Sequence, residues 1–166
     1  MPTVVALGID DNQRVAEARR LVRGDSSEPY LSLAVFDEAG VSEIEPACTT
    51  LAGELAPTTI DISGLGTFQG DSPVIFASVI LTEELRVLHT SVHRALSGFQ
   101  SRRYYNPGAW APHITLGMCE NHRSAEAVFS RLLPHSLRGE YTSSTLLLIS
   151  LPPVSIKRRY ELSGRT

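Results

Sequence analysis

The chain has 166 residues, of which 42% are hydrophobic and 20% charged, with a formal net charge of −3 and a pI near 5.9. A chain of this length can bury one sizeable core, so we expect a single bilobal domain over residues 1–166. The slight excess of acidic residues argues against a broad surface for long nucleic acid, whereas a few local cations could still hold a small anionic ligand.

The cysteines and the N-terminal segment indicate the cellular setting. Cys48 and Cys119 show no spacing typical of a metal or redox site, and we expect two free thiols in a reducing cytosol. The apolar run at residues 1–7 is too short for a signal peptide, and no run approaches the roughly 20 apolar residues that span a bilayer. We therefore predict a cytoplasmic monomer with no metal, no cofactor and no membrane partner.

Strands and helices alternate in the first half of the chain. The residue pattern predicts, in order, a strand over 3–8, a helix over about 12–22, a strand over 31–37, a helix over 41–55, and strands over 58–68 and 73–81. The polar turn Gln69-Gly70-Asp71-Ser72 joins the last two strands.

The second half begins with the clearest helix of the chain, over 83 to about 99, with Thr82 as its N-cap. A long connection over 100–111 follows, and the remaining pattern predicts a strand over 114–119, a helix over about 124–133, and strands over about 141–150 and 154–162. Both halves thus have a similar order of elements. This order predicts an α+β fold of two pseudo-symmetric lobes around a central cleft, each an antiparallel sheet covered by helices.

One short motif occurs twice, separated by half the length of the chain. Pro112-His113-Ile114-Thr115-Leu116-Gly117 aligns with Pro29-Tyr30-Leu31-Ser32-Leu33-Ala34, with Thr115 opposite Ser32. The residue that could move a proton differs, since Tyr30 stands where the second copy has His113. The repeat indicates a two-fold site in which one half has been altered.

Residues two apart on a strand point to the same face, so His113 and Thr115 should lie together, as should Tyr30 and Ser32. A hydroxyl can donate a hydrogen bond to a phosphate oxygen while an imidazole takes or gives a proton. Two such units facing each other would supply a base on one side and an acid on the other. Phosphodiester cleavage needs that pairing.

The segment Pro112-His113-Ile114-Thr115-Leu116 resembles the His-x-Thr/Ser signature of the two-histidine phosphoesterase superfamily, which includes bacterial 2′-5′ RNA ligases and cyclic phosphodiesterases. The preceding Tyr104-Tyr105-Asn106-Pro107-Gly108-Ala109-Trp110 is similar to bacterial 2′-5′ RNA ligase-like members. The resemblance implies a bilobal fold, a metal-independent mechanism, and action on 2′,3′-cyclic phosphates or 2′-5′ linkages of a nucleotide or RNA end. It assigns catalytic roles to His113 and Thr115 and, by position, to Ser32.

Tyr30 departs from the family pattern, which has a histidine there. A tyrosine with an unperturbed pKa of about 10 is protonated near pH 7, so it can donate a hydrogen bond or a proton but is a poor base. One hypothesis keeps His113 as the base, with Tyr30 as acid or phosphate donor and slow hydrolysis. The alternatives are a catalytically reduced protein that binds a nucleotide or RNA end, and a protein-interaction module that binds no nucleotide.

The connection before the second motif holds further candidates. Arg103 and Tyr105 are predicted substrate contacts, one for the phosphate and one for a stacked base, against the alternative of a solvated loop. His89 and His93 are four residues apart on the predicted helix, and we expect a hydrogen-bonded surface or core-edge pair rather than a zinc site. Lys157-Arg158-Arg159 is expected to be a charged edge that prevents aggregation.

Overall fold

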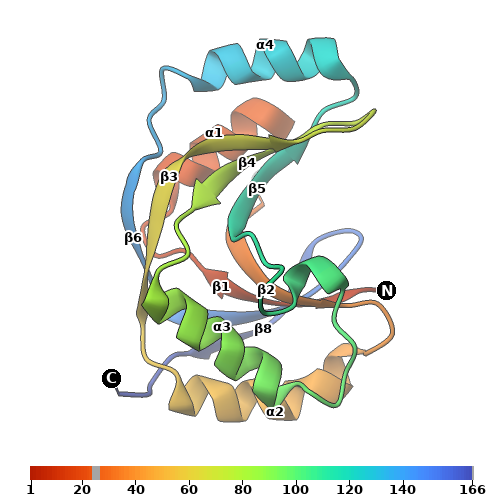
Figure 1. Cartoon of the computed structure of the whole chain (residues 1–166), viewed down its shortest axis with the longest axis vertical. Coiled ribbons are helices and arrows are strands. Elements are labelled where there is room, and N and C mark those ends of the chain that lie inside the picture. The colour runs from red at the N-terminus through yellow and green to blue at the C-terminus, as the bar shows by residue number, and fades with distance from the viewer. Residues whose placement is uncertain (24–26, 166) are drawn as a thin grey trace.

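The computed structural model describes residues 1–23 and 27–165, in which two four-stranded antiparallel sheets pack with helices (Figure 1). The first sheet has the order β2-β1-β7-β8, with β1 at Thr3–Gly8, β2 at Tyr30–Phe36, β7 at Thr145–Ser150 and β8 at Ser155–Glu161. The second has the order β5-β4-β3-β6, with β3 at Thr58–Phe68, β4 at Val74–Val79, β5 at His113–Met118 and β6 at Gly139–Ser143. The predicted α+β fold is confirmed.

The helices pack mainly on strands that are not adjacent to them in the chain. They are α1 at Gln13–Arg23, α2 at Val41–Glu54, α3 at Glu83–Ala95 and α4 at His122–Leu132, with a short 3₁₀ turn, η1, at Arg103–Tyr105. α1 follows β1 in the chain but packs on β5 and on α4, whereas α3 precedes β5 and packs on β2. Figure 1 shows α1 and α4 towards one end of the molecule, and α2 and α3 at the other.

Each sheet takes two strands from each half of the chain. β1 and β2 come from the first half and are extended by β7 and β8, while β3 and β4 receive β5 and β6 from the second half. The two lobes are therefore not the two halves of the sequence. The motif strands β2 and β5 are each the edge strand of a sheet, and they contact one another.

Most predicted elements agree with the structure to within two residues at each end, and two depart further. α3 ends at Ala95 rather than near residue 99, because Leu96 leaves the helical conformation ahead of Ser97 and Gly98. The predicted strand over 141–150 is two strands in the structure. The strand is interrupted at Ser144, where the chain crosses from the second sheet to the first. A continuous apolar run does not reveal that its two ends pair with different strands.

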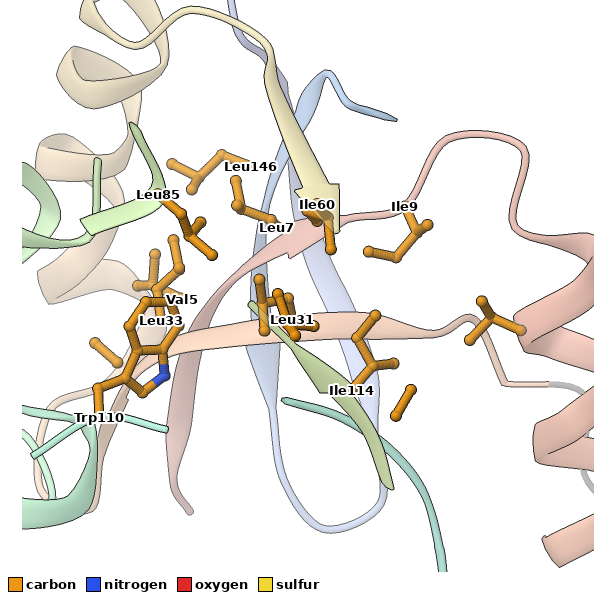
Figure 2. Packing of buried hydrophobic residues seen from close by; sticks show 14 of the residues in the cluster. Val5, Leu7, Ile9, Leu31, Leu33, Ile60, Leu85, Trp110, Ile114 and Leu146 are labelled. Atoms are coloured by element: carbon orange, nitrogen blue, oxygen red, sulfur yellow. The ribbon is translucent and has the colours of Figure 1, made fainter. Parts of the chain in front are cut away.

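Apolar side chains of both sheets share one core. On the motif strands, Leu31, Leu33, Ile114 and Leu116 are fully buried and alternate with the half-buried motif residues. Figure 2 shows Leu31, Leu33 and Ile114 together with side chains from the other strands and from α3. A smaller cluster covers the opposite face of the first sheet and consists of Val4, Ala6, Val35, Leu147 and Ile149.

Each of the two motif strands contains a β-bulge, and the bulges lie at corresponding positions. In β2, Ala6 pairs with Ser32 and Val5 with Ala34, which leaves Leu33 as the extra residue. In β5, Phe76 pairs with Thr115 and Ile75 with Gly117, which leaves Leu116 as the extra residue. Because a bulge re-aims the side chains beside it, each lobe presents its hydroxyl residue in the same local setting. The correspondence of the two motifs thus extends to the backbone.

Among the described residues, no helix has the length and apolar character needed to cross a membrane.

Candidate functional site

His113 begins β5 and is held by the segment that leads into the strand. Its Nδ1 lies 2.8 Å from the carbonyl oxygen of Ala111. Since a carbonyl can only accept, Nδ1 carries the proton, and the Nε2 of the neutral ring keeps its lone pair. Pro112 supports this turn, as its carbonyl accepts the backbone N–H of Val79 at 3.2 Å. The sequence thus fixes both the tautomer and the orientation of the imidazole.

Aromatic rings surround the imidazole. The ring centroid of His113 lies 4.9 Å from that of Phe68, 5.2 Å from that of Phe76 and 6.5 Å from that of Tyr105. Burial lowers the pKa of His113, and the hydrogen bond to Ala111 opposes part of this effect. The ring is therefore neutral near pH 7, which is the form that accepts a proton.

Tyr30 and Ser32 occupy the corresponding positions on the first sheet. Tyr30 pairs with Gly8 and Ser32 with Ala6, so both lie on the face that carries the smaller apolar cluster. The Tyr30 ring packs at the edge of this cluster, and the guanidinium of Arg19 lies 5.9 Å from its centroid.

Tyr105 connects the two motifs. It packs on the smaller apolar cluster of the first sheet, as Tyr30 does, and it also lies against His113 of the second sheet. Burial raises the pKa of its hydroxyl; Arg102 opposes this effect and Tyr30 adds to it. The predicted site residues Tyr30, His113 and Tyr105 are thus brought together, with Tyr105 interacting with both of the others.

Ser32 and Thr115 offer hydroxyl groups on these faces. Both residues are half-buried, and in the described part of the chain neither hydroxyl hydrogen-bonds to another residue. A half-buried hydroxyl without a protein partner can donate to a ligand oxygen.

The two arginines of η1 and its N-cap have different settings. Arg102 binds the Asp37 carboxylate with its Nε at 3.0 Å and its Nη2 at 2.6 Å, and its backbone N–H donates to the Val35 carbonyl at 2.8 Å. It therefore fixes η1 to the end of β2. Arg103 is exposed and lines a separate pocket of about 420 Å³ together with Asp37, Glu38 and Glu43. The structure places Tyr105 beside His113 but places Arg103 among acidic side chains.

His89 and His93 connect α3 to the first motif, and His89 also contacts the segment that leads into the second. The Nε2 atoms of both rings lie 3.0 Å from the carbonyl oxygen of Leu33, the bulged residue after Ser32. His89 is only 2% exposed and stacks on Trp110, with ring centroids 3.8 Å apart and an interplanar angle of 4°. Trp110 directly precedes Ala111, the residue that orients His113. The expected hydrogen-bonded pair is present, and His89 lies inside the core.

Several contributors to the site carry no signal in the sequence. Phe68 and Phe76 belong to no local motif, and their contact with His113 follows from the register of three strands. The carbonyls of Ala111 and Leu33 act through the backbone, so no side-chain pattern marks them. The basic run lies in β8, which is an edge strand as expected, and there Arg158 pairs with Glu45 and Arg159 with Glu28. Across residues 1–23 and 27–165, no group of three His, Cys, Asp or Glu residues is placed to hold a metal ion.

Comparison of the chain with known proteins identifies a family. The family model described as the 2′-5′ RNA ligase superfamily matches residues 7–151. A search of curated proteins finds no significant match.

Three solved structures share the fold over nearly the whole chain. TT0787 of Thermus thermophilus has a TM-score of 0.70 and 19% identity, covering 100% of both chains. LigT of E. coli complexed with 3′-AMP has a TM-score of 0.65 and 18% identity, covering 99% of this chain and 100% of its own. Usb1 of Kluyveromyces marxianus has a TM-score of 0.58 and 14% identity, covering 97% of this chain and 98% of its own.

Proposed function

Because the chain belongs to the 2′-5′ RNA ligase superfamily, whose members are two-histidine phosphoesterases, we propose that it opens 2′,3′-cyclic phosphates or 2′-5′ linkages at a nucleotide or RNA end. In this proposal it acts as a monomer and without a metal, with His113, Thr115, Tyr30 and Ser32 in the catalytic site. A nucleotide-sized substrate agrees with the 3′-AMP in the similar LigT structure.

The observation that carries the proposal is the state of His113. Its Nδ1–H is committed to the Ala111 carbonyl, burial lowers its pKa, and its Nε2 is therefore an unprotonated base. A base of this kind typically contributes about 10²- to 10⁴-fold to a reaction rate.

The other residues complete a proton-balanced step. Water attacks phosphorus as His113 Nε2 takes its proton, and the bond from phosphorus to one ribose oxygen breaks. That oxygen receives a proton from the Tyr30 hydroxyl, which recovers it from the imidazolium through solvent. Thr115 and Ser32 donate hydrogen bonds to the non-bridging oxygens, which carry the charge of the transition state.

Tyr30 also supports a second candidate, a catalytically reduced protein that binds the same nucleotide or RNA end. Phenols are in general weaker acids than imidazolium ions, so protonation of the leaving oxygen should be slower than with two histidines. If the two-histidine mechanism is the relevant one, Tyr30→His should raise the rate.

The test is hydrolysis of 2′,3′-cyclic AMP by the wild type, His113→Ala and Tyr30→His. The control is His135→Ala, because the side chain of His135 is exposed and belongs to neither motif strand. We expect His113→Ala to lose about 10²-fold or more in kcat and the control to lose nothing. An EDTA-treated sample checks the metal independence. Equal rates for the wild type and His113→Ala would reject the enzyme, and binding of AMP without turnover would favour the second candidate.

A further inference from the structure

Phe68 is a large apolar residue that the fold leaves in the open beside His113. It ends β3, is 44% exposed, and meets the imidazole edge-on at 84° with centroids 4.9 Å apart. One face of an aromatic ring next to a neutral catalytic base is thus accessible to a ligand. Core packing does not account for this position, because Phe68 is not part of either buried cluster.

Phe76 extends this aromatic surface towards the hydroxyl of the motif. It pairs with Thr115 on one side and with Gly66 on the other, so its ring shares the face of the sheet that carries Thr115. The centroids of Phe76 and Phe68 lie 4.4 Å apart. A β-carbon at Gly66 would lie only 2.4 Å from the Phe76 ring, so the glycine leaves room for that ring over β3.

Gly64 leaves space next to this surface. It pairs with Ser78, which in turn pairs with His113, so the three residues form one row across β3, β4 and β5. A β-carbon at Gly64 would have no neighbour within 4 Å. The face of the second sheet therefore offers two aromatic rings on one side of the row and open space over a glycine in the row itself.

We propose that Phe68, supported from behind by Phe76, forms a platform that stacks the base of the nucleotide whose phosphate reacts at His113. The inference rests on the proposed function and specifies its substrate class, nucleoside phosphates rather than cyclic phosphates of non-aromatic alcohols. A planar base suits this surface because stacking needs only an exposed π-face. Stacking of one base is worth about 5- to 150-fold in affinity, and it tolerates any of the four bases.

The experiment compares two substrates that share the cyclic phosphate and differ in the base. Steady-state kinetics are measured with 2′,3′-cyclic AMP and with glycerol 1,2-cyclic phosphate for the wild type, Phe68→Ala and Phe68→Leu. The control is Val87→Ala, which shortens a side chain on α3 that is 50% exposed. We expect Phe68→Ala to raise KM for 2′,3′-cyclic AMP about 5- to 150-fold, and to change kcat/KM for the glycerol compound by much less.

Phe68→Leu keeps apolar bulk without a π-face, so it should also raise KM for 2′,3′-cyclic AMP, by less than the alanine variant. Gly64→Leu fills the open space over residue 64, where the base would lie, and should also raise KM for 2′,3′-cyclic AMP selectively. Equal losses on both substrates would instead mean that Phe68 acts only on His113 or on the fold. That result, or an unchanged KM for 2′,3′-cyclic AMP, would overturn the platform.

A wild type that hydrolyses neither compound would reject the proposed function without deciding on the platform. Calorimetric binding of AMP and of inorganic phosphate then gives the answer. The platform predicts weaker AMP binding to Phe68→Ala than to the wild type, with equal phosphate binding to both. Equal affinities for AMP, or no AMP binding by the wild type, would overturn the inference.

Discussion

Replacing His89 with glutamine should remove a large part of the acid sensitivity of the fold. Burial is the main reason that the pKa of His89 falls to about 4, and the neighbouring His93 adds to the effect, while backbone carbonyls of Leu33 and Tyr105 oppose it. Glutamine can still donate to the Leu33 carbonyl through its Nε2 but does not titrate. The substitution therefore separates the hydrogen bond from the protonation.

The size of the effect follows from the two pKa values of His89. A histidine in an unfolded chain has a pKa of about 6.5, so as the pH falls the unfolded chain binds the proton first and the free energy of unfolding decreases. The stability that depends on neutral His89 is fully present above about pH 6.5. It is lost as the pH falls towards about 4, the pKa of His89 in the folded chain. Between about pH 7.5 and about pH 5, this linkage removes about 2 kcal/mol from the free energy of unfolding.

Urea denaturation followed by circular dichroism measures this difference at both pH values for the wild type and His89→Gln. The variant is expected to be less stable than the wild type near neutral pH, since it loses the stack on Trp110. Its stability should nevertheless fall by about 2 kcal/mol less than that of the wild type on acidification. The control His135→Gln changes an exposed histidine and should behave as the wild type does.

If His89→Gln loses as much stability on acidification as the wild type, a group other than His89 takes up the proton, which would contradict the prediction. A control variant that reproduces the effect would refute it in the same way, because His135 has no part in the core.

Further predictions concern the base, the glycines and the thiols. Since burial lowers the pKa of His113, hydrolysis of 2′,3′-cyclic AMP should decline on the acid side with a midpoint below the ordinary histidine value, and His113→Ala should lack this limb. Gly66→Ala should cost about 1–3 kcal/mol in urea denaturation because of the Phe76 ring, whereas Gly64→Ala, with open space around it, should cost nothing. Burial raises the pKa of the Cys48 thiol to about 12 and also that of Cys119, so mass spectrometry should find iodoacetamide on neither residue until the chain is denatured.

Local periodicity explains what the sequence could predict. The alternation of His113 and Thr115 with buried Ile114 and Leu116 is a property of any half-buried strand, and the structure reproduces it. The N-cap of α3 is also local, since the Thr82 hydroxyl accepts the Leu85 N–H at 3.2 Å.

What escaped prediction depends on partners distant in the chain. The bulges at Leu33 and Leu116 each insert one residue against a neighbouring strand, and no residue type announces that. In the sequence Arg102 is as suitable for phosphate binding as its neighbour, but its ion pair with Asp37, 65 residues away, exists only once η1 lies against β2. Tyr105 meets His113 for the same reason, because the turn that carries it is fixed to the first sheet.

The exchange of strands between the two halves has a consequence for how the molecule folds. A fragment ending after β4 would contain both β1 and β3, yet each would lack the neighbour that β7 or β6 supplies, and the bare edges would expose apolar residues. Neither half can therefore be a stable intermediate that waits for the other. The chain should fold and unfold in one cooperative transition, and the two motifs should gain or lose their shared geometry together.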